Sequence, residues 1–266
     1  ELLAARGKEM PEPGKPGFWE DVNMYATELV QVAGGRWDAV IIDEAQDFTE
    51  ENWMLVEALA TGRRLWAFQD PQQAFWQDRS VPQHLFASYF DLTRSYRSPP
   101  ELMRVAQAIR AGEPALEAIG AAEEAGRLAL VTCQSASSVA DKVANEIGKL
   151  RSDGLQQQEI AVISLRGLGV EGSVLSSKAL EQHAPVRVDD EALEECIVAD
   201  TFLRFKGLER PAIIITDLHL VEGDAKVRLF IALTRALTTA RVVAPAASIG
   251  KYLGPGAPNG KADGDG

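Results

Sequence analysis

Cysteine is scarce in this 266-residue sequence: Cys133 and Cys196 form neither a CxxC pair nor a disulfide framework, which favours a reducing cytoplasm. No apolar run approaches the roughly 18 residues of a membrane-spanning helix, so we expect no membrane partner. Basic residues are also in deficit, 27 against 39 acidic ones. The net charge of −12 excludes a uniformly basic surface, so we expect any contact with nucleic acid to be local.

Short apolar runs alternate with segments of helical spacing, a pattern that predicts an α/β fold with mostly parallel sheets. Hydrophobic residues make up 46% of the chain, enough for a sizeable core. We predict strands over residues 40–42, 64–68, 92–97, 128–132, 160–164, 213–216 and 241–244. We predict helices over residues 18–33, 50–60, 100–109, 137–151, 173–182 and 224–238, and a linker or exposed loop around 111–126.

The strongest local signal is the acidic string Asp43-Glu44-Ala45-Gln46-Asp47, directly after the first predicted strand. Ligands of parallel α/β proteins bind beyond the carboxyl ends of strands. An acid at that position can hold Mg²⁺ beside phosphate oxygens, and a second acid can orient or deprotonate an attacking water. The structural alternative is a strand that ends in a solvated acidic turn.

A glutamine-rich string, residues 69–76, follows the second predicted strand. A glutamine amide both donates and accepts hydrogen bonds, so it can bridge a nucleotide phosphate and a neighbouring domain. Phe75 and Trp76 could offer bases a stacking platform, or they could be core aromatics beside a polar turn.

Three further strings carry cations, two of them beside predicted strands and one on a predicted helix. In residues 92–98 an arginine follows a predicted strand, where its planar, permanently charged fork suits a phosphate or a surface ion pair. In residues 201–209, Lys206-Gly207 is a cationic, flexible turn, and Glu209 could accept hydrogen bonds from a sugar hydroxyl. In residues 229–236, Arg235 projects from an apolar predicted helix and needs a partner, either a nucleotide phosphate or a buried carboxylate.

Together these strings resemble motifs of the superfamily 1 helicases of the UvrD-like class. Five motifs occur in family order over roughly residues 36–245, and five in sequence are hard to obtain by chance. The matching segments are residues 43–47 for motif II (Walker B), 70–73 for motif III, 92–98 for motif IV, 201–209 for motif V and 229–236 for motif VI.

The resemblance implies RecA-like lobes of the P-loop NTPase type, an α/β fold that binds ATP and Mg²⁺ and moves on single-stranded DNA. It implies an incomplete first lobe over residues 1–88, carrying motifs II and III. The second lobe would span residues 89–247, and we expect a disordered tail over residues 248–266.

The resemblance also implies roles for individual residues. Asp43 and Glu44 would serve Mg²⁺ and the catalytic water, and Gln73 would sense the γ-phosphate. Arg97 and Arg235 would act as arginine fingers from the second lobe, and so neutralise charge that develops during phosphoryl transfer.

Five more positions carry a role by the same likeness. Glu209 would face the ribose, with Lys206 and Gly207 beside it. Trp76 stands where the family often has a base-stacking aromatic, and Thr201 matches a residue that contacts the nucleic-acid backbone.

Three positions depart from the family pattern: Leu203 stands in place of a histidine, Ser95 in place of an asparagine and Gln69 in place of a glycine. The largest departure is the P-loop, a Gly-x-x-x-x-Gly-Lys string followed by Ser or Thr, whose amides and lysine cradle phosphates. None of the Gly-Lys pairs in the chain is followed by Ser or Thr.

We therefore expect the chain to be the C-terminal portion of an ATP-dependent DNA helicase, inactive alone and partnered by an upstream P-loop segment of the same protein. The alternative is a non-catalytic, helicase-like binding scaffold that never binds ATP by itself. A nuclease that uses the acids of residues 43–47 is a weaker alternative, because it leaves Arg97 and Arg235 unexplained.

Overall fold

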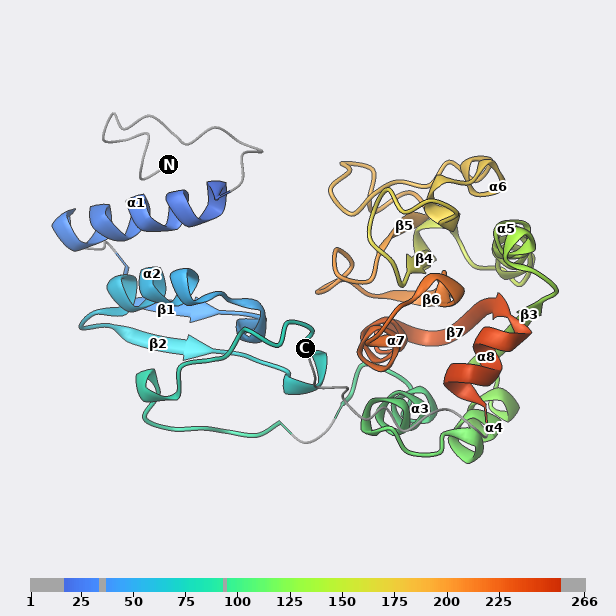
Figure 1. The fold of residues 1–266 in the computed structure, drawn as a ribbon, viewed down its shortest axis with the longest axis horizontal. Helices are drawn as coiled ribbons and strands as arrows, with labels where there is room; N and C mark the ends of the chain where they lie inside the picture. Colours follow the sequence, from blue (N-terminus) through green and yellow to red (C-terminus); the bar gives the residue numbers. More distant parts are fainter. Residues whose placement is uncertain (1–16, 34–36, 93–94, 255–266) are drawn as a thin grey trace, which may run out of the picture. The chain divides into compact units, whose positions relative to one another are not determined.

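The computed structural model describes residues 17–33, 37–92 and 95–254. The chain divides into two compact units, Glu1–Asp91 and Leu92–Gly266, which are described separately here (Figure 1). Each unit has helices, parallel strands and its own hydrophobic core, so the prediction of a parallel α/β fold is confirmed. Within the described residues, no helix is both long enough and apolar enough to cross a bilayer.

The first unit is a small two-stranded sheet with helices beside it. Along the chain its elements are α1 (Phe18–Ala33), β1 (Ala39–Ile42), α2 (Glu50–Ala60) and β2 (Arg64–Ala67). The two strands pair in parallel, and α2 is the crossover between them. Parallel strands need such a crossover because a tight hairpin would reverse the chain direction.

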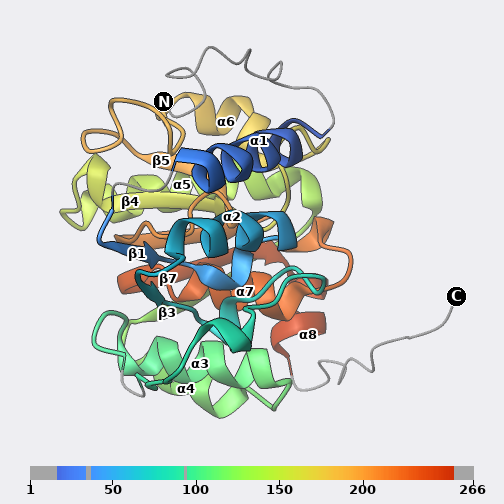
Figure 2. The same cartoon turned by 90° about the vertical axis from the view of Figure 1, so that its left-hand side faces the viewer.

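The core of the first unit lies on the α2 side of this sheet. Trp53 and Val56 of α2 are buried against Ile42, with Leu65 packed beside them. The helix begins at a capping box in which Thr49 and Asn52 exchange hydrogen bonds, and this fixes α2 directly after the acidic string. Helix α1 packs on α2, so both helices lie on the same side of the sheet (Figures 1 and 2).

The second unit is built on a five-stranded sheet in which all pairs are parallel. The strand order is β3-β7-β6-β4-β5, so chain order and spatial order differ. The strands are β3 (Leu128–Cys133), β4 (Ile160–Ser164), β5 (Val198–Thr201), β6 (Arg210–Thr216) and β7 (Ala236–Pro245).

Helices cover both faces of this larger sheet (Figure 1). On one face α5 packs Val143 and Ile147 against Ile214 of β6 and other strand residues. On the opposite face α7 packs against β6 and against α3. Burial on both faces explains why the central strand is a continuous apolar run rather than an alternating one. The helices of this unit are α3 (Pro100–Ala111), α4 (Leu116–Glu124), α5 (Val139–Ser152), α6 (Lys178–Glu181), α7 (Ala225–Leu233) and α8 (Ala246–Leu253).

Several predicted boundaries were wrong. Residues 95–97 belong to no strand, and the rest of the strand predicted for 92–97 includes residues 93–94, which lie outside the described residues. The segment 111–126, predicted as a loop, contains α4. The tail predicted as disordered from residue 248 begins too early, because α8 continues to Leu253; residues 255–266 lie outside the described residues.

Candidate functional site

The acidic string of the first unit forms a tight turn directly after β1. Glu44 has a φ of 50° and a ψ of 41°, a left-handed conformation that is uncommon for residues other than glycine. Its backbone N–H donates to Oδ1 of Asp43 at 2.9 Å. Asp43 is exposed and Glu44 is half-buried, so this strained turn presents carboxylates at the carboxyl end of the strand.

Gln46 ties this turn to the end of β2. Its side chain is 4% exposed, its Nε2 donates to Oε2 of Glu44, and its Oε1 accepts from the backbone N–H of Asp70 at 3.0 Å. Asp70 in turn accepts a 2.8 Å hydrogen bond from Nε2 of Gln73. The residues predicted as motifs II and III are therefore linked through one buried amide.

Asp43 and Glu44 can supply only some of the ligands that a bound Mg²⁺ needs. Among the residues that the structure describes, no group of three or more His, Cys, Asp or Glu side chains is placed to hold a metal. Mg²⁺ usually keeps several waters and takes one or two carboxylates together with substrate phosphates. The two acids fit that pattern, and the remaining ligands would come from water and nucleotide.

Trp76, predicted to stack on bases, is 38% exposed. Its ring lies edge-on to Phe75 with centroids 4.9 Å apart, and the guanidinium of Arg79 lies 4.6 Å from the ring centroid. The ring is accessible and already takes part in a cation–π contact. Its contact with nucleic acid stays a prediction.

In the second unit, residues from the three predicted motifs IV, V and VI are joined by direct bonds. Nε of Arg97 lies 3.0 Å from Oε2 of Glu209. Oγ of the neighbouring Ser98 donates to the carbonyl oxygen of Thr234 at 3.0 Å. The backbone N–H of Arg210 donates to the carbonyl oxygen of Arg235 at 3.2 Å. The structure thus brings Arg97 close to Glu209 and to the turn that carries Arg235, both of which lie more than 100 residues further along the chain.

Arg235 lies in the turn between α7 and β7 rather than on a helix, which corrects the predicted helix over 224–238. The residue is 3% exposed. Its Nε donates to the carbonyl oxygen of Ile231 at 3.2 Å, and its Nη2 donates to the hydroxyl of Thr234 at 3.4 Å. These bonds fix the direction of a buried, permanently charged group, whose burial is costly unless it is compensated.

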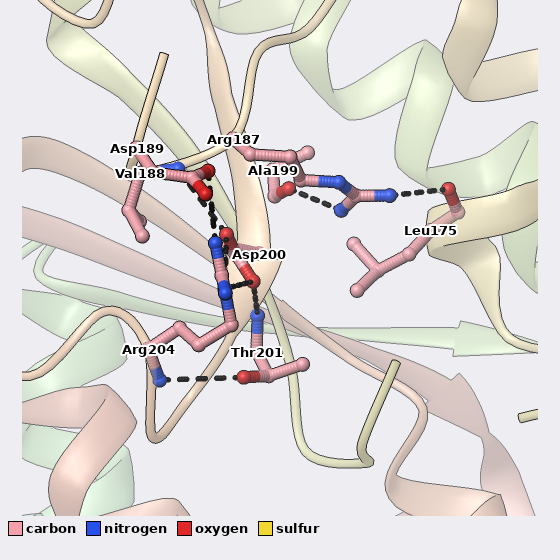
Figure 3. Close-up of polar contacts among 8 residues, drawn as sticks. All are labelled: Leu175, Arg187, Val188, Asp189, Ala199, Asp200, Thr201 and Arg204. Carbon is pink, nitrogen blue, oxygen red and sulfur yellow. Dashed lines mark hydrogen bonds and ion pairs between the residues drawn. The ribbon is translucent and has the colours of Figure 1, made fainter. Parts of the chain in front are cut away.

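Thr201, predicted to touch nucleic acid, ends β5 and is 5% exposed. Its hydroxyl accepts from the backbone N–H of Arg204 at 3.3 Å and so closes the following turn (Figure 3). The preceding Asp200 is fully buried and accepts from the N–H groups of Thr201 at 2.7 Å and Val188 at 3.2 Å.

Sequence reasoning missed the residues that hold this turn, Asp200 and Arg204. Nε of Arg204 donates to both carboxylate oxygens of Asp200 at 3.1 Å, and its Nη2 lies 2.8 Å from Oδ1 of Asp189 (Figure 3). The hydrogen bond from Arg204 holds the pKa of Asp189 below its usual range, and the bond to Asp200 raises the pKa of Arg204. An aspartate inside an apolar strand, four residues before an arginine, is the signal that could have indicated the pair.

The Lys206-Gly207 turn lies between Thr201 and Glu209. Gly207 has a φ of 80°, which glycine adopts without strain and which costs other residues about 1 kcal/mol or more. Lys206 is half-buried, and its backbone N–H donates to the carbonyl oxygen of Leu203 at 3.2 Å. The structure does not test their predicted place beside a ribose.

Comparisons with known proteins give little further information. No protein-family model matches the chain, and no curated protein matches it. Among 81 matching chains of solved structures is the C-terminal domain of a possible DNA helicase from Lactobacillus plantarum WCFS1. It is 18% identical, the alignment covers 57% of this chain and 88% of that one, and the TM-score is 0.41. This likeness is too distant to support an argument about fold or function.

Proposed function

We propose that the chain is the part of an ATP-dependent DNA helicase or translocase that carries motifs II to VI, and that it works in the cytoplasm with a P-loop segment. ATP hydrolysis would be coupled to movement along single-stranded DNA. The chain alone would turn over ATP poorly or not at all, because none of its Gly-Lys pairs is followed by Ser or Thr.

The convergence of Arg97, Glu209 and the Arg235 turn supports this proposal most directly. The three strings come from separate stretches of sequence, and within the second unit the fold brings them side by side. An ordinary surface ion pair explains the 3.0 Å Arg97–Glu209 contact alone. The backbone bond from Arg210 to Arg235 belongs to the parallel pairing of β6 with β7, and the Ser98 hydroxyl bonds to Thr234 in the same turn.

The proposed roles follow from the chemistry of each group. Glu44 would orient or deprotonate the attacking water, and Gln46 and Asp43 hold its carboxylate and backbone in place. Arg97 and Arg235 would neutralise charge on the transferring phosphoryl group. Mg²⁺, when bound beside Asp43, would neutralise nucleotide phosphates. Trp76 and Thr201 would contact single-stranded DNA.

ATP hydrolysis by the full-length product of the gene, measured with and without single-stranded DNA, tests the proposal. Wild type should hydrolyse ATP faster with DNA present. Glu44→Gln should abolish turnover and keep nucleotide binding, because the amide keeps the size of the side chain and loses the base. Turnover that survives in Glu44→Gln would remove Glu44 from this role.

The non-catalytic scaffold is the second candidate, favoured by the lack of a P-loop string among the 266 residues. The coding sequence upstream of Glu1 separates the two. A Gly-rich string that ends in Gly-Lys-Ser or Gly-Lys-Thr supports the helicase, and a start codon directly before Glu1 supports the scaffold.

A further inference from the structure

A cleft beside helix α5 of the second unit lies outside all five predicted motifs. Its volume is about 520 Å³, a size in the range of small-molecule binding sites. The lining is almost entirely polar, and it consists of Lys142, Asn145, Lys149, Ser152 and Asp153 with Gly148 among them, and of Arg241 from β7. A cleft with such a lining suits a charged ligand rather than an apolar one.

Positive charge is in excess around this cleft, although the chain as a whole has a net charge of −12. The lining carries the cations Lys142, Lys149 and Arg241 and one acid, Asp153. Glu146 is the other acid close by, but it is 2% exposed and does not line the cleft. The local excess of cations therefore favours an anionic ligand.

Glu146 fixes the positions of two of these cations. Its carboxylate lies 2.7 Å from Nζ of Lys149 and also contacts Nη1 of Arg241. A buried ion pair is weak evidence for a role in stability, because apolar side chains often stabilise the same positions equally well. Its effect here is to hold an ammonium and a guanidinium at the cleft before any ligand arrives, which lowers the entropic cost of binding.

Lys142 supplies a second positive position in the cleft. It lies seven residues before Lys149, which is about two turns or ~10 Å along the same side of α5. Within the described part of the chain, the structure gives Lys142 no ion pair. Two separate positive positions along one cleft suit a ligand with more than one anionic group.

Gly148 is the lining residue that the fold itself does not explain. It lies inside α5 with a φ that is not positive, and glycine in a helix interior is less stable than alanine. No neighbouring group lies within 4 Å of the place where a Cβ would stand, so close packing does not require glycine there either. The absence of a side chain does keep the cleft open between Lys142 and Lys149.

We propose that the cleft along α5 is a binding site for a small ligand that carries two or more phosphate groups. Lys142 would bind one phosphate, and Lys149 and Arg241 would bind another through charge-assisted hydrogen bonds. The amide of Asn145 adds a donor between them. A solvated helix face with ordinary surface ion pairs is the alternative, and it leaves Gly148 unexplained. The inference does not depend on the proposed function.

Calorimetric titration of the 266-residue chain with tripolyphosphate at low ionic strength tests the site. Wild type should bind tripolyphosphate at least tenfold more tightly than inorganic phosphate, because the cleft offers two positive positions. Lys142→Gln should weaken tripolyphosphate binding at least fivefold, since one of these positions is lost. Lys178→Gln, at an exposed position of α6, is the matched control and should stay within twofold of wild type.

Gly148→Leu tests the cleft without removing a charge. Leucine is a strong helix former, so the urea midpoint should be no lower than that of wild type. Tripolyphosphate binding should nevertheless weaken at least fivefold, because the added side chain fills the cleft. In wild type, tripolyphosphate should also shift the amide resonance of Gly148 in nuclear magnetic resonance spectra.

Three results would each overturn the inference. The first is equal tripolyphosphate binding by wild type, Lys142→Gln and Gly148→Leu. The second is an amide resonance of Gly148 that does not move at saturating tripolyphosphate. The third is tighter binding at this cleft of a hexaglutamate peptide or of an oligothymidylate strand, which would assign it to an acidic protein segment or to nucleic acid.

Discussion

At the scale of single residues, the feature with the greatest consequence is the buried amide of Gln46. This one side chain donates a hydrogen bond to Glu44 in the turn after β1 and accepts one from the backbone N–H of Asp70 after β2. A carboxylate or a methyl group cannot do both, because the two partners need a donor and an acceptor. This explains why a glutamine occupies the position between two acids.

Replacing Gln46 should destabilise the first unit. Gln46→Ala leaves the Asp70 amide and the Glu44 carboxylate without this partner, so we expect a loss of about 1–3 kcal/mol in the free energy of unfolding. Gln46→Glu should cost at least as much, since it sets a second carboxylate against Glu44. Urea denaturation followed by tryptophan fluorescence measures the loss. Gln77→Ala, at an exposed position, is the control; equal midpoints for Gln46→Ala and wild type would contradict the bridging role.

At the scale of elements, the sequence predicts which polar segment follows which strand. It does not predict the hydrogen bonds and ion pairs between segments far apart along the chain. The acidic and glutamine-rich strings each follow a strand as predicted, because an apolar run that stops at a polar string is a local pattern. The structure shows that these two strands are paired. The bonds between Arg97 and Glu209 depend on a strand order that differs from chain order.

One helix boundary and one strand were missed for physical reasons. The stretch from α7 into β7 is buried on every side, so it shows neither the 3.6-residue nor the two-residue period, and the turn at Arg235 was predicted as helix. Strand β5 was missed because Asp200 interrupts its apolar run. The strand tolerates this buried carboxylate because Arg204 and two backbone amides bind it.

The contact between α5 and β7 predicts a pH dependence. Glu146 of α5 is 2% exposed and is bonded to Lys149 and to Arg241 of β7. Burial by itself would raise the pKa of Glu146, but the bonds and charges of Lys149 and Arg241 outweigh burial and lower it. A carboxyl whose pKa is lower in the folded state stabilises the fold above its unfolded pKa of about 4.3, and this contribution is lost as the pH falls through the lower folded value.

At pH 7, Glu146→Gln should therefore have a free energy of unfolding about 1–3 kcal/mol lower than wild type, and a lower urea midpoint. The difference should shrink as the pH falls below about 4. Urea midpoints across this range measure the effect. Glu117→Gln, at an exposed position of α4, should show no such convergence. A difference between Glu146→Gln and wild type that is constant with pH would contradict the charge network.

At the scale of the whole molecule, the described residues of each unit form a hydrophobic core against that unit's own sheet. Ile214 is fully buried in the larger one, between α5 and the strands of the second unit. Ile214→Ala should cost the second unit about 2–5 kcal/mol, from lost burial and the cavity left behind. Hydrogen exchange should show faster opening of α5 and unchanged opening of α2. Equal acceleration in both helices would mean that the two units unfold as one.

The proposed function assigns an arginine of the second unit, Arg235, to the hydrolysis of ATP. The most direct measurement is the rate of DNA-stimulated ATP hydrolysis by the full-length product of the gene carrying Arg235→Ala, with Arg104→Ala, an exposed arginine on α3, as the control. We expect Arg235→Ala to lower the rate by roughly 10³ or more, as the loss of an arginine finger does, with nucleotide binding retained. An unchanged hydrolysis rate would contradict the claim and leave Arg235 as a structural residue of its turn.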